Sequence, residues 1–254
     1  MIIASWNPAR AQSNCAINNT AIKVGEKINY AIYYSVAGAY INAGKASFET
    51  KMETLNSKPV IHVTGLGSSN KSYDFIFKVR DKYETFIDPN TFQPLKFLRN
   101  VNEGGHKINQ NVTFNKHTNT AITNEGLFKV PACVQDVLSA VYYARNINFE
   151  LLQYNDKISF SLFLDNEVFD MYVRYLGRET ITTQYGTFKT HKFKPLLLEG
   201  TIFKGGEKMT VWVTDDENHL PVRIESPIVV GSVKVDMMGF KDIRYPLTSL
   251  IKRR

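Results

Sequence analysis

Apolar and polar residues alternate along most of this chain, and turn-forming residues stand at nearly every break in the alternation. A period of two places the apolar residues of a strand on one face of a sheet. Glycine, asparagine, aspartate and proline separate consecutive segments, often at intervals of about ten residues. The pattern predicts an all-β protein whose antiparallel strands form a strongly curved sheet or a barrel-like sandwich. The clearest segments are Ile28 to Tyr34, Tyr73 to Val79, Ile158 to Leu164, Leu220 to Ile224 and Val229 to Met237.

Short polar stretches mark the expected turns. Asp165-Asn166-Glu167 is predicted to join a hairpin, and so is Asp215-Asp216-Glu217-Asn218. Gly65 to Ser69 is rich in glycine but lacks the lysine of a phosphate loop and the spacing of a nucleophile elbow, so we interpret it as a flexible hairpin loop. The tail from Lys241 to Arg254 is weakly patterned and is expected to be coil.

One segment follows a helical period instead. Pro131 suits a helix entrance, and Asp136 would lie in the first turns, where a negative charge is favourable. We therefore expect one helix over about 134–146, packed against the sheet. The apolar residues at helical spacing are Val134, Val137, Leu138, Val141 and Tyr142.

The chain has 254 residues, of which 43% are hydrophobic, enough for a substantial core. We expect a signal remnant and N-terminal arm over 1–24 and one all-β domain over 25–240, with a C-terminal tail over 241–254. The domain could also be two intimately packed halves split by the helix. The net charge of +7 is scattered, and the one tight basic cluster is Lys252 to Arg254. Because no recognition helix or zinc-finger spacing occurs, a nucleic-acid partner is not expected.

The N-terminus suggests export. Ala9 to Ser13 resembles the end of a secretory signal, although the charged start and full apolar core are missing. We expect a periplasmic or envelope protein with a truncated signal and no transmembrane span; an ordinary frayed terminus is the alternative. In an exported protein, the only two cysteines, Cys15 and Cys133, would form a disulfide. They could instead be two unrelated small residues, and a lipid anchor on Cys15 has weaker support.

Catalytic and metal-binding patterns are weak in this sequence. The five histidines are not spaced as ligand pairs, so neither a metal nor a cofactor is expected. Asp215 or Asp216, together with Glu199, could supply an acid/base pair for glycan cleavage. An ordinary hairpin turn explains the aspartates equally simply, and we prefer that interpretation.

Aromatic residues give the strongest indication of a binding surface. They make up 12% of the chain, and Tyr33, Phe163 and Trp212 are expected on the outer face of their strands. Either another layer of protein covers such a face or a ligand does. A curved sheet with an apolar interior could hold a small hydrophobic molecule or an acyl chain. Our candidate ligand-binding residues are Tyr30, Tyr34 and Trp212 as apolar lining and Arg223 as a possible anion contact.

Several short strings occur together in a fixed order between Gly25 and Gly239. In that order they resemble the exported bacterial family called domain of unknown function 3108. The resemblance implies an envelope protein of Gram-negative bacteria with a mostly β fold, and it supplies no catalytic residues. The strings are Gly25-Glu26-Lys27 with Tyr30, Ala43-Gly44, Asp136 to Ala140 with Tyr143 and Arg145, Gly186-Thr187-Phe188, Pro195, and Trp212 with Asp216 and Pro221-Val222-Arg223.

Three functions remain open from the sequence. The leading hypothesis is an exported, non-enzymatic protein that binds an apolar or amphipathic molecule, or an envelope partner, on a curved sheet. The alternatives are a glycan-acting hydrolase of the cell envelope and a structural module of a surface assembly. The sequence gives neither the ligand nor the oligomeric state.

Overall fold

The computed structural model describes residues 15–36, 39–198, 205–228 and 231–254. Within them, fifteen strands form one sheet in the order β8-β7-β6-β5-β4-β3-β2-β1-β14-β13-β12-β11-β10-β9, and β15 pairs with β11 off this path. All the paired strands run antiparallel, as the alternation predicts. The strands are β1 (Lys27–Val36), β2 (Ala39–Leu55), β3 (Lys58–Ser69), β4 (Arg80–Ile87), β5 (Pro94–Glu103), β6 (His106–Asn115), β7 (Thr120–Thr123), β8 (Gly126–Lys129), β9 (Lys157–Leu164), β10 (Glu167–Thr182), β11 (Gly186–Pro195), β12 (Thr210–Thr214), β13 (Pro221–Pro227), β14 (Ser232–Lys241) and β15 (Leu250–Arg253).

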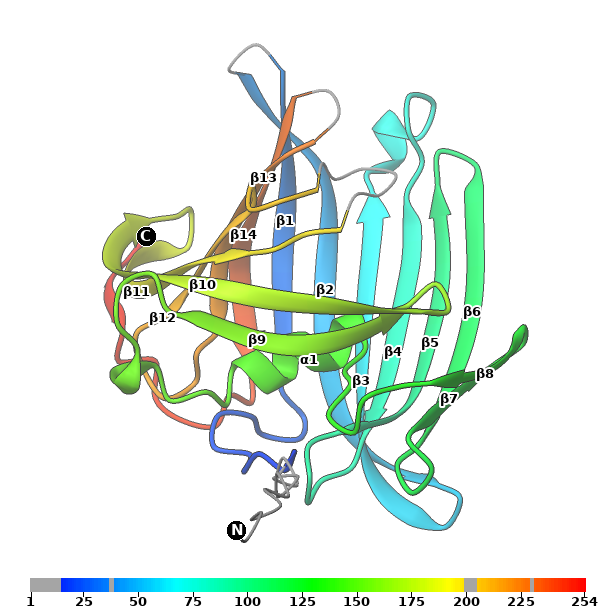
Figure 1. Cartoon of the computed structure of the whole chain (residues 1–254). Helices are drawn as coiled ribbons and strands as arrows, with labels where there is room; N and C mark the ends of the chain where they lie inside the picture. The colour runs from blue at the N-terminus through cyan, green and yellow to red at the C-terminus, as the bar shows by residue number, and fades with distance from the viewer. Residues whose placement is uncertain (1–14, 37–38, 199–204, 229–230) are drawn as a thin grey trace, which may run out of the picture.

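The sheet curls strongly without closing into a barrel. In Figure 1, β9 and β10 cross in front of β2 to β5, and the helix α1 (Val137–Ala144) lies between these layers, where it contacts β4 and β9. Phe163 of β9 packs against Phe114 of β6 and Phe128 of β8, with ring centroids 6.1 and 5.9 Å apart. Apolar packing therefore holds the β9 end of the sheet over its concave face. This arrangement confirms the predicted all-β fold with one helix packed against a strongly curved sheet.

The helix is shorter than the predicted 134–146. Asp136 is its N-cap and accepts hydrogen bonds from the backbone N–H groups of Leu138 and Ser139, while the Ser139 hydroxyl accepts one from the Asp136 N–H. This reciprocal capping box fixes the helix start at Val137. The preceding Gln135 is extended and pairs with β9, donating its N–H to Ser161 and accepting from Phe163. A strand contact far away in the sequence therefore shortens the helix.

Two expectations near β3 are wrong. Gly65 to Ser69 belongs to β3 and is not a hairpin loop. A Cβ at Gly65 would lie 3.0 Å from the Phe48 ring, so glycine leaves room for that side chain. Residues 73–79 do not form the predicted strand: Lys71–Tyr73 is a short 3₁₀ helix (η1), and Phe75 and Phe77 after it are exposed.

The C-terminal tail is also more ordered than predicted. β15 pairs with β11 through Gly186 to Phe188, and the Lys189 N–H donates to the Ser249 carbonyl. Leu250 packs beside the buried Phe188 in a second core formed around β1 and β11 to β14. Pairing with a distant strand explains the order that weak local patterning does not reveal.

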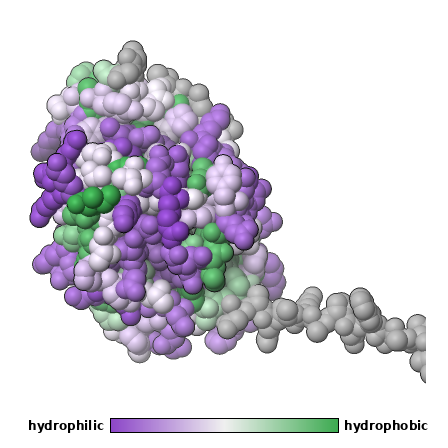
Figure 2. Space-filling model, turned by 90° about the vertical axis from the view of Figure 1, so that its left-hand side faces the viewer, coloured by the Kyte–Doolittle hydropathy of each residue, from purple (hydrophilic) through white to green (hydrophobic). Residues whose placement is uncertain are grey.

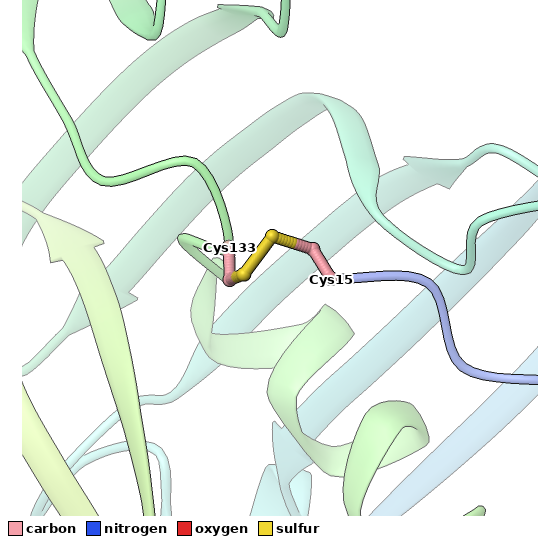
Figure 3. The surroundings of a disulfide bond; sticks show 2 residues. All are labelled: Cys15 and Cys133. Carbon is pink, nitrogen blue, oxygen red and sulfur yellow. A yellow bond between two sulfur atoms is a disulfide. The ribbon is translucent and has the colours of Figure 1, made fainter. Parts of the chain in front are cut away.

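The N-terminal arm packs against the sheet and is linked covalently to the segment before α1. Ala21 and Ile22 are buried, and the Asn146 side-chain oxygen accepts hydrogen bonds from the Thr20 and Ala21 N–H groups. Cys15 and Cys133, 118 positions apart, form a disulfide (Figure 3). Of the three possibilities for the cysteines, the structure contains the disulfide. Ala9 to Ser13, the expected end of a signal, lies outside the described residues.

The expected hairpin turns at 165–167 and 215–218 are confirmed. The first joins β9 to β10, and the second joins β12 to β13. Asp165 and Asn166 both have positive φ, of 49° and 65°, a backbone conformation that asparagine and aspartate tolerate better than most residues. Turn chemistry was therefore a reliable guide at these positions.

Candidate ligand-binding cavity

An apolar cavity of about 90 Å³ lies between α1 and the sheet. Its walls come from α1 and its C-cap residue, and from the strands β1, β2, β13 and β14. Tyr30, one of the four predicted ligand-binding residues, is part of the wall. The lining residues are Ile28, Tyr30, Phe48, Val141, Tyr142, Arg145, Pro221, Ile224 and Val235.

Two tyrosines give the cavity a buried wall with few free polar groups. The Tyr30 hydroxyl donates to the Pro221 carbonyl at 3.0 Å, and its ring meets Phe48 edge to face at 5.8 Å. Burial raises the pKa of both Tyr30 and Tyr142, so both phenols are neutral across the physiological range. The side chains therefore present ring surface rather than charge to the cavity.

A buried ion pair forms the polar end of the same wall. The Arg145 guanidinium binds Glu26 through two hydrogen bonds, of 2.6 and 2.8 Å, and also donates to the Asn218 carbonyl. Both side chains are at least 97% buried, so each needs the other to offset its loss of hydration. Since Glu26 neutralises Arg145, the cavity favours an apolar group rather than an anion.

Arg223 does not line this cavity. Its guanidinium forms hydrogen bonds of 2.6 and 2.8 Å with Asp236, which is almost fully buried. The two residues are partners on adjacent strands β13 and β14. Arg223, which we expected to contact an anionic ligand, is therefore already paired with a carboxylate of the protein itself.

Trp212 and Tyr34 also lie outside the lining. The Trp212 indole N–H donates to Glu179 at 2.9 Å, and the Lys192 ammonium lies 5.3 Å from its ring centroid. Tyr34 of β1 is half-buried, and its ring lies beside Gly231. Trp212 and Arg223 are cross-strand partners, and Trp212 shares the second core with Tyr30, but of the four candidate residues only Tyr30 lines the cavity.

The aromatic residues expected on outer faces are covered by the protein itself. Tyr33 is buried and donates its hydroxyl to Gln184 at 2.7 Å. Phe163 is 1% exposed within the core, and Trp212 is 8% exposed. Packing accounts for these three residues, which was one of the two explanations that the sequence allowed.

A second, larger cavity of about 230 Å³ lies where the tip of the β9–β10 hairpin approaches β5, β6 and the turn between β7 and β8. Its lining is rich in amides, including Asn109, Gln110 and Asn166. Several of its polar groups already bind each other: Arg99 pairs with Asp165, and the Asn166 amide donates to Glu125 at 2.7 Å. These contacts tie the hairpin tip to the opposite part of the sheet.

A cluster of ionisable groups around Asp215 was not predicted. His191 lies between Asp215, at 2.8 Å from Nε2, and the Tyr175 hydroxyl, at 3.0 Å from Nδ1. Burial lowers the pKa of His191. Glu150 completes a set of potential metal ligands, but the Arg178 guanidinium already bridges Glu150 and Asp215. A cation at this position would have to displace that guanidinium, so the cluster is better suited to an ion-pair network than to a metal.

The carboxylates proposed for glycan cleavage have separate environments. Asp216 accepts hydrogen bonds from Thr214, Asn218 and the Ser249 N–H, which use both of its oxygens to hold the turn. Asp215 binds His191 and Arg178, and neither cavity described above includes it. Glu199 lies outside the described residues.

Arg145 was missed as a member of the cavity wall, and so was its buried partner Glu26. Both appear in the strings that carry the family resemblance, and Arg145 follows the apolar stripe of the predicted helix. The sequence signal for this buried ion pair was an arginine directly after an apolar helix and a glutamate directly before an apolar strand. The sequence could not show that residues 119 positions apart would meet.

The fold and the cavity define the class of this molecule: it is a barrel-like all-β protein, with an open, curved antiparallel sheet and a helix on its concave side. The chain belongs to the family described as protein of unknown function (DUF3108), whose model matches residues 29–238. The predicted family is thereby confirmed. Among the described helices, none has the length and apolar character needed to cross a membrane.

One solved structure shows a similar barrel-like fold. A β-barrel-like protein of the domain of unknown function DUF1849 from Brucella abortus matches with a TM-score of 0.54 and 8% identity, covering 89% of this chain and 100% of that one. A putative exported protein with a YmcC-like fold from Bacteroides fragilis matches with a TM-score of 0.33 and 14% identity, at the same coverages. The first likeness shows the fold alone. A search of curated proteins found no significant match.

Proposed function

We propose that this protein is an exported, non-enzymatic binding protein that takes the apolar end of an amphipathic or apolar molecule into the cavity beneath α1. The observation that carries the proposal is the lining. Ile28, Phe48, Ile224 and Val235 converge there, and the nearby charge of Arg145 is neutralised by Glu26. An apolar space with few polar groups is the usual form of a site for an apolar ligand.

The size of the cavity limits what can enter. Drug-sized ligands occupy roughly 300–1,000 Å³, whereas this space measures about 90 Å³. Only the last few carbons of a chain would fit, and the remainder of the ligand would lie outside. Val141 of α1, which is 42% exposed, provides an apolar rim for that part.

The disulfide supports export. Disulfides persist in oxidising compartments such as the periplasm and are rare in the cytosol. Cys15 and Cys133 are bonded, and the bond joins the arm to the segment that leads into α1. A periplasmic or envelope location is therefore part of the proposal.

Native mass spectrometry of protein isolated from a Gram-negative cell envelope tests the binding. We expect a co-purified molecule with an alkyl chain, and we expect Val141→Trp to reduce its occupancy by filling the rim of the cavity. Val168→Trp is the matched control, because Val168 has a similar exposure of 38% and lines neither cavity described above. A ligand-free wild type, or equal occupancy in both variants, would refute this site.

A further inference from the structure

Three consecutive large apolar side chains project from one end of the sheet. Phe75, Ile76 and Phe77 are 85%, 70% and 44% exposed. They follow η1 in the connection between β3 and β4, at the upper end of the molecule in Figure 1. By contrast, the face seen in Figure 2 is mostly hydrophilic, with hydrophobic residues in small separate spots. Burial in the core does not explain this run, here called the apolar tip (residues 75–77).

Polar contacts fix the connection that carries the apolar tip. Asp74 accepts hydrogen bonds from the Ser69 hydroxyl and from Arg80, both at 2.6 Å. The N–H groups of Ile76 and Phe77 donate to the Tyr73 carbonyl. These bonds hold the backbone while the side chains project outward, so the tip needs little ordering before it binds a partner.

The neighbouring turn supports the tip from one side. The Phe77 ring lies against Gly104, where a Cβ would be only 2.4 Å from the ring, and the Gly104 N–H donates to the Lys78 carbonyl. Phe77 is therefore partly held by the β5–β6 turn. Phe75 and Ile76 remain the most exposed members.

The exposed charged residues that flank the apolar tip in the sequence are positive. Lys71 and Lys78, on either side of it, are both exposed. The acidic residue between them, Asp74, is paired with Arg80. The segment therefore presents apolar side chains flanked by two cations, on a chain whose net charge is +7.

We propose that the apolar tip docks this protein onto an anionic lipid bilayer. Apolar side chains can enter the boundary between headgroups and acyl chains while lysines bind the anionic headgroups. The projecting form of the tip favours a deformable bilayer, since a protein partner would need a matching groove. This inference does not depend on the cavity beneath α1, and a failure of either proposal leaves the other standing.

Vesicle flotation tests the proposal on the full chain. We expect the wild type to float with vesicles that contain phosphatidylglycerol and less with vesicles of phosphatidylcholine alone. Phe75→Ser with Ile76→Ser should weaken binding by roughly tenfold or more. The control is Leu151→Ser with Tyr154→Ser, because these residues are 77% and 69% exposed elsewhere on the surface. The control variant should bind like the wild type.

Further measurements separate the lipid from other partners. Lys71→Glu with Lys78→Glu should abolish the preference for phosphatidylglycerol, and thermal melting should show all variants folded. The proposal is overturned if the wild type does not float, if the tip variant binds like the wild type, or if the control loses as much binding. Sedimentation without vesicles gives the remaining test: a dimer that the tip variant dissociates would assign the tip to a second copy of this chain instead.

Discussion

At the residue scale, the pair formed by Glu26 and Arg145 is the most consequential contact near the cavity. It joins the first residue before β1 to the C-cap of α1, far apart in the sequence. Both side chains are buried, so removing one partner leaves an uncompensated charge in the interior. The pair fixes the position of α1 against the sheet and so determines the shape of the cavity.

Glu26→Leu should therefore lower the free energy of unfolding by about 3–5 kcal/mol. The matched control is Glu49→Leu, which breaks the exposed pair between Glu49 and Lys27 and should cost at most about 1 kcal/mol. Urea denaturation of the three proteins measures both changes. Equal effects of the two substitutions would show that the buried pair has no special role.

Asp136 gives a pH-dependent prediction. Burial raises the pKa of Asp136 from 3.8 to about 6, although hydrogen bonds from Thr85 and the helix N-terminus oppose that rise. The folded protein then holds this proton more tightly than the unfolded chain. The resulting stabilisation is complete below about pH 4 and is lost as the pH rises through about 6.

Asp136→Asn tests this prediction, because asparagine is neutral at every pH and also serves as an N-cap. The stability of the wild type relative to this variant should fall by about 2–3 kcal/mol between pH 4 and pH 7. Urea denaturation at four pH values in that interval measures the difference. A difference that is constant, or that grows with pH, would contradict the assigned pKa.

The sequence supplied only some of the residues at the cavity. Tyr30 could be predicted from its place in a clear strand, and Val141 and Tyr142 from the helical period. Arg223 and Trp212 looked available because the sequence does not show their partners Asp236 and Glu179. The sequence shows which side chains can form hydrogen bonds or ion pairs, but it does not show which of them already have a partner elsewhere in the fold.

At the element scale, β15 shows how tertiary pairing creates order in a weakly patterned tail. Leu250 is half-buried against the second core, whereas the next residue, Ile251, is 56% exposed. Leu250→Ala should cost about 1–2 kcal/mol of unfolding free energy, less than a fully buried leucine. Ile251→Ala should change it by no more than about 0.5 kcal/mol. Thermal or urea denaturation of both variants checks this contrast, and equal values would mean that β15 does not pack as described.

The local sequence pattern predicted the short hairpin turns correctly, but it failed where pairing with a distant strand determines the conformation. The turns at 165–167 and 215–218 follow from residues that tolerate positive φ or favour tight turns. The helix was recognised by its period but not by its true start, because Gln135 pairs with β9. The run at 73–79 alternates as a strand would, yet two of its aromatic residues are exposed at a loop tip.

At the scale of the whole molecule, the disulfide links the N-terminal arm to the middle of the chain. Closing a loop of 118 residues restricts the unfolded chain, and the chain-entropy model gives about 4–5 kcal/mol for that restriction. Reduction should lower the free energy of unfolding by up to this amount. The variant Cys15→Ser with Cys133→Ser should then match the reduced wild type and be insensitive to reductant. Thiol titration of the denatured, unreduced protein provides the direct check, since two free thiols would rule out the bond.

The open sheet, the helix on its concave side and the apolar space between them form one arrangement. Because β9 and β10 fold over β2 to β5, α1 is held inside the curve, with a small cavity between it and β1, β2, β13 and β14. The central claim is that an alkyl chain end enters this cavity. The claim depends on contacts between the ligand and named side chains, which can be observed directly.

Methyl-detected NMR during titration with octyl glucoside, below its micelle-forming concentration, tests the claim most directly. We predict shift changes and ligand contacts at the methyl groups of Ile28, Val141, Ile224 and Val235, with none at the exposed Ile251. The terminal methyl of the octyl chain should show the strongest contacts. Saturable binding without contacts at these four residues, or no binding at all, would contradict the claim.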